Sequence, residues 1–215
     1  GLRYNPSDNF SFDFNFFNNK VNDLIEWKLV ATGKNNINIY SYFNVNQVET
    51  KGLEFNTTYK KKNTWEIKFG YQLLYAYDTE IVRNIKNETS YFARDAETLT
   101  SVNLNKDDYF GLFNRSRHMG TAKLNYHLND KTDLNAMLTY RSKYALSDSN
   151  GNDILDAYDK FIDGYSLCDI GITYQISALK SCQIGVKNMF GFTNPEYISN
   201  IAGRLYYMNF KINFK

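Results

Sequence analysis

The sequence has no long hydrophobic run and is poor in proline, cysteine and histidine. Its 215 residues include 2 Pro, 12 Gly, 2 Cys and 2 His. No stretch of about 18 apolar residues occurs, which excludes a membrane-spanning helix. The small number of prolines and glycines argues against a disordered or linker-rich chain. Lys and Arg number 25 against 23 Asp and Glu, so the net charge of +2 gives no electrostatic footprint for a nucleic-acid partner.

The start of the chain lacks the parts of an export signal. It reads Gly1-Leu2-Arg3-Tyr4, with no initiator methionine, no charged segment and no apolar core. A mature protein and an internal fragment would both begin in this way.

Aromatic residues are the abundant class. They make up 17% of the chain, with 18 Tyr and 16 Phe, more than a packed core of this size needs. Mean hydropathy is nevertheless -0.53, a value ordinarily found in water-soluble proteins. A β-barrel that spans a membrane reconciles the two values, because only alternate residues of each strand face lipid and aromatic side chains gather at the membrane interfaces.

Polar and apolar residues alternate with a period of two in several segments, which indicates strands with one apolar and one polar face. Near the end of the chain, positions 206, 208, 210, 212 and 214 are all large and apolar. Residues 65–77 alternate as regularly and, at about 3.3 Å per residue, span roughly 40 Å, enough to cross a bilayer when tilted. Four phenylalanines between positions 10 and 16 share one face, an arrangement that is hazardous in water and ordinary in lipid.

The alternation predicts eight strands, preceded by the tail of another strand at residues 1–4. The strands are expected at about 10–27, 37–59, 65–77, 117–128, 132–144, 168–176, 181–187 and 204–214. Short turns at 5–9, 60–63, 129–131 and 177–180 alternate with long connections at 28–36, 79–114, 147–163 and 190–203, of which 79–114 is the longest and is expected to be irregular. Such asymmetry is typical of outer-membrane barrels, with short periplasmic turns and long extracellular loops. The predicted fold is all-β: an antiparallel transmembrane β-barrel segment of about eight strands.

Short motifs near both ends of the chain resemble those of one barrel family. Residues 185–190 read GVKNMF, similar to the family's G-v-x-N-l-f stretch, and residues 203–206 read GRLY, similar to its G-R-x-y entry to the last strand. Phe214 is similar to the family's terminal aromatic, although one Lys follows it here. Residues 48–54, VETKGLE, resemble its G-x-E strand, and residues 22–25 after an aromatic strand also fit. In order and spacing, these motifs resemble the C-terminal part of the barrel of TonB-dependent outer-membrane receptors.

The resemblance implies a transporter in the outer membrane of a Gram-negative bacterium and not an enzyme. Barrels of this family have 22 strands and a plug, so residues 1–215 are expected to be the C-terminal portion of a longer receptor whose plug and earlier strands lie outside this chain. The receptor would import a scarce nutrient: a siderophore, haem, cobalamin, a glycan or a peptide. Its expected partners are the TonB–ExbB–ExbD complex through the plug, the rest of the barrel and outer-membrane lipid, with a surface lipoprotein as a further candidate.

Two groups of residues are candidates for contacts in such a receptor. Aromatic and charged side chains of the long connections would contact the nutrient: Tyr91, Arg94, Asp108, Tyr109 and Arg115. Charged residues on the polar faces of the strands would face the lumen and pair with the plug: Glu54, Glu66, Lys68, Lys123, Arg141, Asp169 and Lys187. No nucleophile paired with a base stands out, so no catalytic residue and no cofactor are expected.

Three further features have a functional and a structural interpretation. His118 and His127 could bind haem or a metal, but we expect a polar rim or lumen residue in each case. Residues 148–156 resemble a calcium loop in composition, yet the glycine is at the fourth place and no Glu closes the site, so a flexible polar loop is favoured and no metal is expected. Cys168 and Cys182 are expected on neighbouring strands, with Cys182 opposite about Gln175, too far from Cys168 for a disulfide.

Two other functions remain open at this point. The chain could form a self-contained eight-stranded outer-membrane barrel with a structural or adhesive role, since an even strand count permits closure. It could also be a soluble β-sandwich that binds glycans, although the phenylalanine row and the long strands count against this. A second sheet packed on the aromatic rows would favour the sandwich.

Overall fold

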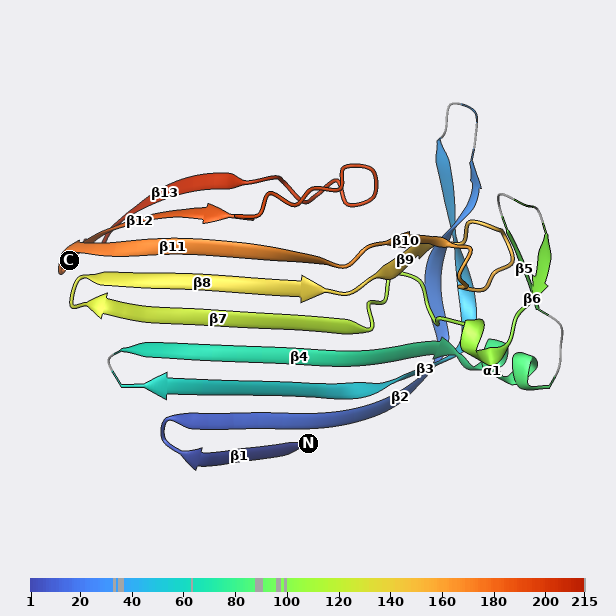
Figure 1. Cartoon of the computed structure of the whole chain (residues 1–215), viewed down its shortest axis with the longest axis horizontal. Helices are drawn as coiled ribbons and strands as arrows, with labels where there is room; N and C mark the ends of the chain where they lie inside the picture. Colours follow the sequence, from blue (N-terminus) through green and yellow to red (C-terminus); the bar gives the residue numbers. More distant parts are fainter. Residues whose placement is uncertain are drawn as a thin grey trace.

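The computed structural model describes residues 1–32, 34, 37–62, 64–87, 91–95, 98 and 100–214, without the side chains at 26–30, 32, 38, 43, 46, 94 and 106. Nine strands form one antiparallel sheet in the order β1-β2-β3-β4-β7-β8-β11-β12-β13, and two separate strand pairs, β5–β6 and β9–β10, lie in the connections between them (Figure 1). The strands are β1 (Leu2–Ser7), β2 (Phe10–Thr32), β3 (Asn38–Lys61), β4 (Trp65–Asp78), β7 (His118–Asn129), β8 (Thr132–Arg141), β11 (Tyr165–Ser177), β12 (Lys180–Lys187) and β13 (Leu205–Ile212). The eight predicted strands and the preceding one are thus confirmed.

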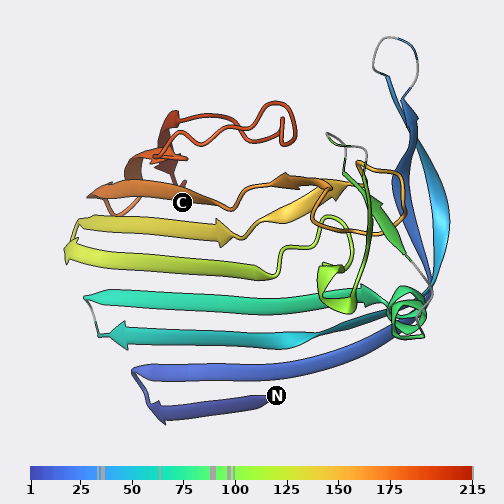
Figure 2. The ribbon, with the colours of Figure 1, turned by 45° about the vertical axis from the view of Figure 1, so that its right-hand side comes forward.

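The connections at one end of the sheet are short and those at the other end are long, as the sequence predicted (Figure 2). The first turn is shorter than expected, because β1 continues to Ser7 and leaves only Asp8 and Asn9 between the strands. The turn between β11 and β12 is also shorter and contains only Ala178 and Leu179. The first of these turns joins β1 to the first residues of β2, and the second joins the end of β11 to β12.

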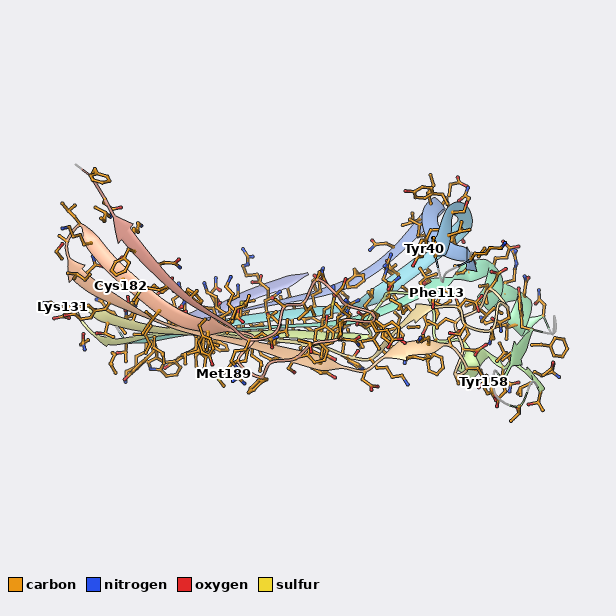
Figure 3. The ribbon with its side chains drawn as sticks, turned by 90° about the horizontal axis from the view of Figure 1, so that it is seen from above. Tyr40, Phe113, Lys131, Tyr158, Cys182 and Met189 are labelled. Atoms are coloured by element: carbon orange, nitrogen blue, oxygen red, sulfur yellow. The ribbon has the colours of Figure 1, made fainter. Side chains whose placement is uncertain are left out.

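The predicted long connection at 28–36 is wrong. Strand β2 has 23 residues and continues to Thr32, and β3 has 24 residues and begins at Asn38, which pairs with Thr32. Residues 33, 35 and 36 of the predicted connection lie outside the described residues. Figure 3 shows this extension, marked by Tyr40, bending away from the rest of the sheet. The alternation of apolar residues fades here because a strand that is wetted on both sides needs only backbone pairing to persist.

The longest connection is not irregular, as had been expected, but contains the helix α1 (Thr79–Lys86), the strand pair β5 (Phe92–Arg94) and β6 (Ser101–Asn103), and the 3-10 turn η2 (Lys106–Asp108). Asp78 starts the helix, because its carboxylate accepts hydrogen bonds from the backbone N–H groups of Glu80 and Ile81. The next connection holds a second pair, β9 (Tyr144–Ser147) and β10 (Lys160–Ile162), so β8 ends at Arg141 and not near 144. Within the described residues, no helix is both long and apolar enough to cross a membrane.

The register joins the apolar rows of separate strands into one continuous face. One row crosses six strands as Phe12, Thr57, Phe69, Ala122, Leu138 and Cys168, each opposite the next. Large side chains on this face remain open to the surroundings, for example Phe16 at 71% and Phe210 at 66% exposure. Among the described residues no second sheet packs on these rows, and the buried hydrophobic cluster of Tyr109, Ala145, Ile154 and Leu155 lies in the long connections instead. The sandwich alternative fails on this observation.

The two cysteines are far apart in the register and both are free, as predicted. Cys168 lies opposite Leu138, whereas Cys182 lies opposite Tyr174 and not opposite Gln175. The error of one residue arises because the register of the two strands shifts between Gln175 and Ser177, next to the turn.

Candidate functional site

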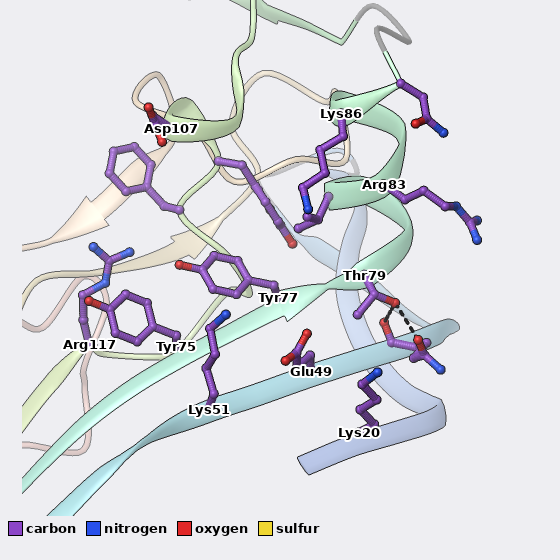
Figure 4. A pocket seen from close by; sticks show the side chains of 15 residues that line it. Lys20, Glu49, Lys51, Tyr75, Tyr77, Thr79, Arg83, Lys86, Asp107 and Arg117 are labelled. Carbon is purple, nitrogen blue, oxygen red and sulfur yellow. Dashed lines mark hydrogen bonds between the residues drawn. The ribbon is translucent and has the colours of Figure 1, made fainter. Parts of the chain in front are cut away.

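A cleft of about 690 Å³ lies at the long-loop end of the sheet, between β3, β4, α1 and the segment that follows η2 (Figure 4). Its lining is basic and aromatic. The residues that line it are Lys20, Gln47, Glu49, Lys51, Tyr75, Tyr77, Thr79, Val82, Arg83, Lys86, Asn87, Asp107, Tyr109, Phe110 and Arg117.

Strands β3 and β4 supply one wall of the cleft. Lys51 lies opposite Tyr75 and Glu49 lies opposite Tyr77, so four lining side chains project from one face of the strand pair. The rings of Tyr75 and Tyr77 stack with centroids 6.2 Å apart. Two adjacent aromatic rings flanked by charged groups form a surface that accepts a flat or amphipathic ligand.

Helix α1 forms the opposite wall and is fixed to the sheet by its first residue. The Thr79 hydroxyl donates to the backbone carbonyl of Gln47 at 3.2 Å and lies 3.0 Å from its side-chain Oε1 (Figure 4). From the same helix, the exposed Lys86 extends toward Tyr77, whereas the exposed Arg83 lies at the margin of the cleft and extends away from the tyrosines (Figure 4). The helix therefore brings two cations to a wall whose base is held by the sheet.

Tyr109 fills the base of the cleft. It is only 5% exposed, its ring lies 5.7 Å from that of Tyr77, and its hydroxyl accepts a hydrogen bond from the backbone N–H of Asp78 at 3.0 Å. Burial raises the pKa of Tyr109 far above its ordinary value, so the phenol stays neutral. Tyr109 thus couples the end of β4 to the segment that closes the cleft.

The electrostatics of the cleft favour an anion. The lining contains five basic side chains and two acidic ones. The Arg117 guanidinium lies 4.8 Å from the ring centroid of Tyr75, a cation–π contact. Sequence reasoning missed this set because its members come from four separate segments, and only tertiary packing collects them.

The five residues predicted to contact a nutrient do not gather at one point. Tyr109 lines the cleft, while the Tyr91 hydroxyl accepts from the Asn84 side-chain amide at 3.0 Å. Asp108 accepts from the backbone N–H of Asn105 at 2.7 Å within its own turn. Arg115 is exposed, and Arg94 belongs to β5, with its side chain outside the described part of the structure. Their roles in ligand binding stay predictions.

The seven residues predicted to face the lumen all lie on the face opposite the apolar rows. Glu54 accepts from the Gln72 side-chain amide at 2.9 Å. Glu66 pairs with Lys60 at 3.0 Å and with Lys68 at 3.2 Å, and Lys68 lies opposite Lys123. The register of each strand with its neighbours places all seven residues on the polar face: Glu54, Glu66, Lys68, Lys123, Arg141, Asp169 and Lys187.

Three of these residues take part in local contacts at the long-loop end. Arg141 donates to the Ser116 hydroxyl at 2.6 Å and stacks over the Tyr144 ring at 3.7 Å. Asp169 accepts from the backbone N–H of Asn188 at 2.8 Å. The Lys187 ammonium lies 5.9 Å from the ring centroid of Tyr207 on β13. Their pairing with a plug stays a prediction.

The two histidines lie at opposite ends of the sheet and on opposite faces. His118 shares the face of the apolar rows, opposite Leu73, and its Nδ1 lies 2.7 Å from the Tyr71 hydroxyl. It is therefore a rim residue of the outer face and not a lumen residue. His127 is on the polar face near a tight turn and bonds to Asp133. Within the described residues, no group of three or more His, Cys, Asp or Glu could hold a metal ion.

The calcium-like loop is tightly organised by its own hydrogen bonds. Asp156 is fully buried and accepts from the side-chain amides of Asn150 and Asn152 at 3.1 and 2.9 Å. Asp159 accepts from the backbone N–H groups of Ser149 and Asp156 at 2.7 and 2.8 Å. These protein donors occupy both carboxylates, so the polar side chains of the loop form hydrogen bonds within the loop itself. The flexibility expected from its composition stays a prediction.

Two motif residues hold the last long connection. Asn188 adopts a left-handed φ of 48°, and its side-chain amide donates to the carbonyls of Phe192 and Ala202 at 2.7 and 2.9 Å. Arg204 donates to the carbonyl of Met189 at 2.8 Å. The GVKNMF and GRLY motifs are therefore in direct contact, although Met189 and Arg204 are 15 positions apart in the sequence.

Comparison with known proteins agrees with this architecture. The family model described as "TonB dependent receptor-like, beta-barrel" matches residues 1–189. Among solved structures, the ferric enterobactin receptor PfeA of Pseudomonas aeruginosa is similar with a TM-score of 0.61 and 18% identity, over 99% of this chain and 30% of that one. The siderophore receptor PirA of Acinetobacter baumannii gives 0.61 and 15% identity over 99% and 30%.

A third structure, the ferric-catecholate import receptor Fiu of Escherichia coli K12, gives a TM-score of 0.62 and 15% identity over 99% of this chain and 26% of that one. The chain thus spans less than a third of the length of these receptors, and identities this low show the fold alone. Among curated proteins, no significant match is found.

Proposed function

This chain belongs to the family of TonB-dependent receptor β-barrels, and we propose that it is the C-terminal barrel portion of an active importer of a scarce nutrient. The family places it in the bacterial outer membrane as part of a transport protein. The plug domain and the earlier strands would come from sequence outside residues 1–215. The complete receptor would draw its energy from the TonB–ExbB–ExbD complex through that plug.

The observation that carries this proposal is the open sheet. Strands β1 and β13 are its two end strands, and in the described part of the chain they do not pair with each other. Unpaired strand edges cannot be left inside a bilayer, because their backbone N–H and C=O groups would lack partners. Further strands of a larger barrel would satisfy both edges, which disfavours the self-contained eight-stranded alternative.

The polar face supports a plug on the inner side. It carries charges such as Glu54, Lys123 and Asp169 deep along the strands, where they face the barrel interior and not lipid. Buried charges are costly unless they are paired. We propose that a plug domain supplies partners for these residues in the complete receptor.

For the nutrient, we favour a siderophore among siderophore, haem, cobalamin, glycan and peptide. The support is that the structural neighbours include receptors named for ferric enterobactin and ferric catecholate. The proposed contacts from this chain are Tyr91, Arg94, Asp108 and Arg115, together with residues of the plug, whereas Tyr109 is buried at the base of the cleft. A surface lipoprotein would be an accessory partner and not a requirement.

Uptake measurements test the importer. The complete gene is expressed in a strain that lacks its own siderophore receptors, and the uptake of radiolabelled ferric siderophores is followed with and without a functional TonB. Iron accumulation that requires both the gene and TonB is the expected result. Uptake that is independent of TonB would overturn the energy coupling, and TonB-dependent uptake of haem or cobalamin in place of iron chelates would overturn the nutrient class.

A further inference from the structure

The cleft opens on the outer face of the sheet and not on the lumen face. The last apolar row in this region contains Phe16, Leu53 and Leu73, which lie opposite one another on β2, β3 and β4. The next positions on the same face, two residues farther along each strand, are Asn18, Lys51 and Tyr75, followed by Lys20, Glu49 and Tyr77. The register contains no shift over these rows, so the face does not change.

The height of the cleft matches the upper boundary of the membrane. From Trp65 to Leu73 the apolar row of β4 covers eight steps, about 26 Å along the strand, close to the apolar band of about 25 Å expected for an outer-membrane barrel. Lys51 and Tyr75 lie one row, about 7 Å along the strands, beyond Leu53 and Leu73. They therefore reach the level of the lipid headgroups of the outer leaflet.

The side chains at this level suit a phosphorylated headgroup. Lys20, Lys51 and Arg117 come from the sheet side, and Arg83 and Lys86 come from α1. Among the described residues, neither Lys51 nor Lys86 has an ion-pair partner, and Arg83 reaches Glu80 only at 3.9 Å. Basic side chains next to a membrane attract anionic lipid headgroups, and tyrosines favour the membrane interface.

We propose that this cleft binds the phosphate-bearing headgroup of an outer-leaflet glycolipid. The glycolipid acyl chains would continue down the apolar rows that begin at Leu53 and Leu73, whereas a nutrient on its way through the barrel would meet the opposite, polar face. The phosphates would contact the lysines and arginines, and the sugar rings would lie over Tyr75 and Tyr77. A free anion could reach the same cations, and the test separates the two sources.

The test uses the complete receptor, extracted from its outer membrane in mild detergent. Phosphorylated glycolipid that remains bound is quantified by mass spectrometry for the wild type, for the double variant Lys51→Gln with Lys86→Gln, and for a control double variant, Lys131→Gln with Lys180→Gln. The control removes the same charge at the tight-turn end of the sheet, which Lys131 marks in Figure 3. Heat-modifiable gel mobility verifies that each barrel is folded.

A several-fold loss of bound glycolipid in the cleft variant, with wild-type retention in the control, is expected. Lys51→Arg with Lys86→Arg should restore retention, because it keeps both charges. Equal retention in all folded variants would overturn the proposal. So would full displacement of the glycolipid by millimolar inorganic phosphate, because that result would indicate a site for a soluble anion and not one that also depends on the acyl chains.

Discussion

Tyr207 on β13 lies across Gly185 on β12, its direct partner in the sheet. A Cβ atom at Gly185 would come within 2.6 Å of the Tyr207 Cζ, and one at Gly171 on β11 would come within 2.8 Å of the Tyr207 hydroxyl oxygen. The two glycines therefore provide the space in which a large ring lies flat on the polar face. An aromatic ring laid over strand glycines covers backbone that would otherwise be exposed.

Replacing Gly185 with alanine should destabilise the barrel by about 1–3 kcal/mol, because the added methyl group overlaps both Tyr207 and the Ile170 carbonyl oxygen, which lies 2.6 Å from the Cβ position. Urea unfolding in lipid vesicles measures the change. Gly120→Ala is the matched control, since its Cβ would meet nothing nearer than 3.8 Å. Equal stability of the two variants would show that Tyr207 moves without cost.

Asn188→Ala should release the connection between β12 and β13. The substitution removes the two hydrogen bonds donated by the side-chain amide and the one accepted from the Phe192 N–H, and it places alanine at a left-handed φ. A loss of about 2 kcal/mol or more is expected. Asn188→Gly removes the strain of the left-handed φ but also lacks the side-chain amide. A stability close to that of the alanine variant would therefore show that the loss of stability comes from the missing amide contacts. Full recovery by glycine would contradict this account.

Asp78→Ala should loosen helix α1 without unfolding the sheet. The carboxylate is the cap that accepts from the backbone N–H groups of Glu80 and Ile81, and its removal should cost about 1 kcal/mol. Faster amide exchange over residues 79–87 is the expected readout. Asp78→Asn keeps a capping oxygen and should leave exchange nearly unchanged; equally fast exchange in both variants would point to charge and not to capping.

The loop around Asp159 should open more easily as the pH rises from about 4 to 7. Burial raises the pKa of Asp159 to about 7 from 3.8, although N–H groups of Asp156 and Ser149 oppose the rise. In that window Asp159 holds a proton in the closed loop and releases it in the open loop. The equilibrium constant for opening therefore rises by up to about tenfold per pH unit and stops rising above pH 7. Protection factors of amides 149–156, corrected for intrinsic exchange, measure this. The turn at 178–179 provides the reference, and protection that rises with pH would refute the prediction.

Much of the sheet could be predicted from local pattern, whereas the extracellular end could not. The alternation at 65–77 and 206–214 correctly predicted β4 and β13, because period-two spacing of apolar residues is enough to identify a strand with one apolar face. The connection at 28–36 was misjudged, since strands held by backbone pairing above the membrane leave no hydrophobic period. The helix α1 was missed in a 36-residue connection, where Asp78 at its start was the one local signal of a cap.

The candidate cleft illustrates the same limit. Lys51 and Tyr75 belong to strands that were predicted. The alternation alone does not show that they, unlike Leu53 and Leu73 on the same face, lie beyond the apolar band. Their placement beside Arg83 and Lys86 depends on how the long connection folds back. The predicted contact residue Tyr109 does reach this region, but as a buried ring and not as an exposed one.

The period-two alternation alone determined that this chain makes long strands with one apolar face, because side-chain direction in a strand depends only on position parity. Only the tertiary structure decided that eight such faces align into one surface, that both outer edges of the sheet stay open, and that five cations from distant segments meet above the apolar band. Register, closure and loop packing depend on contacts between residues far apart in sequence, and no local pattern contains that information.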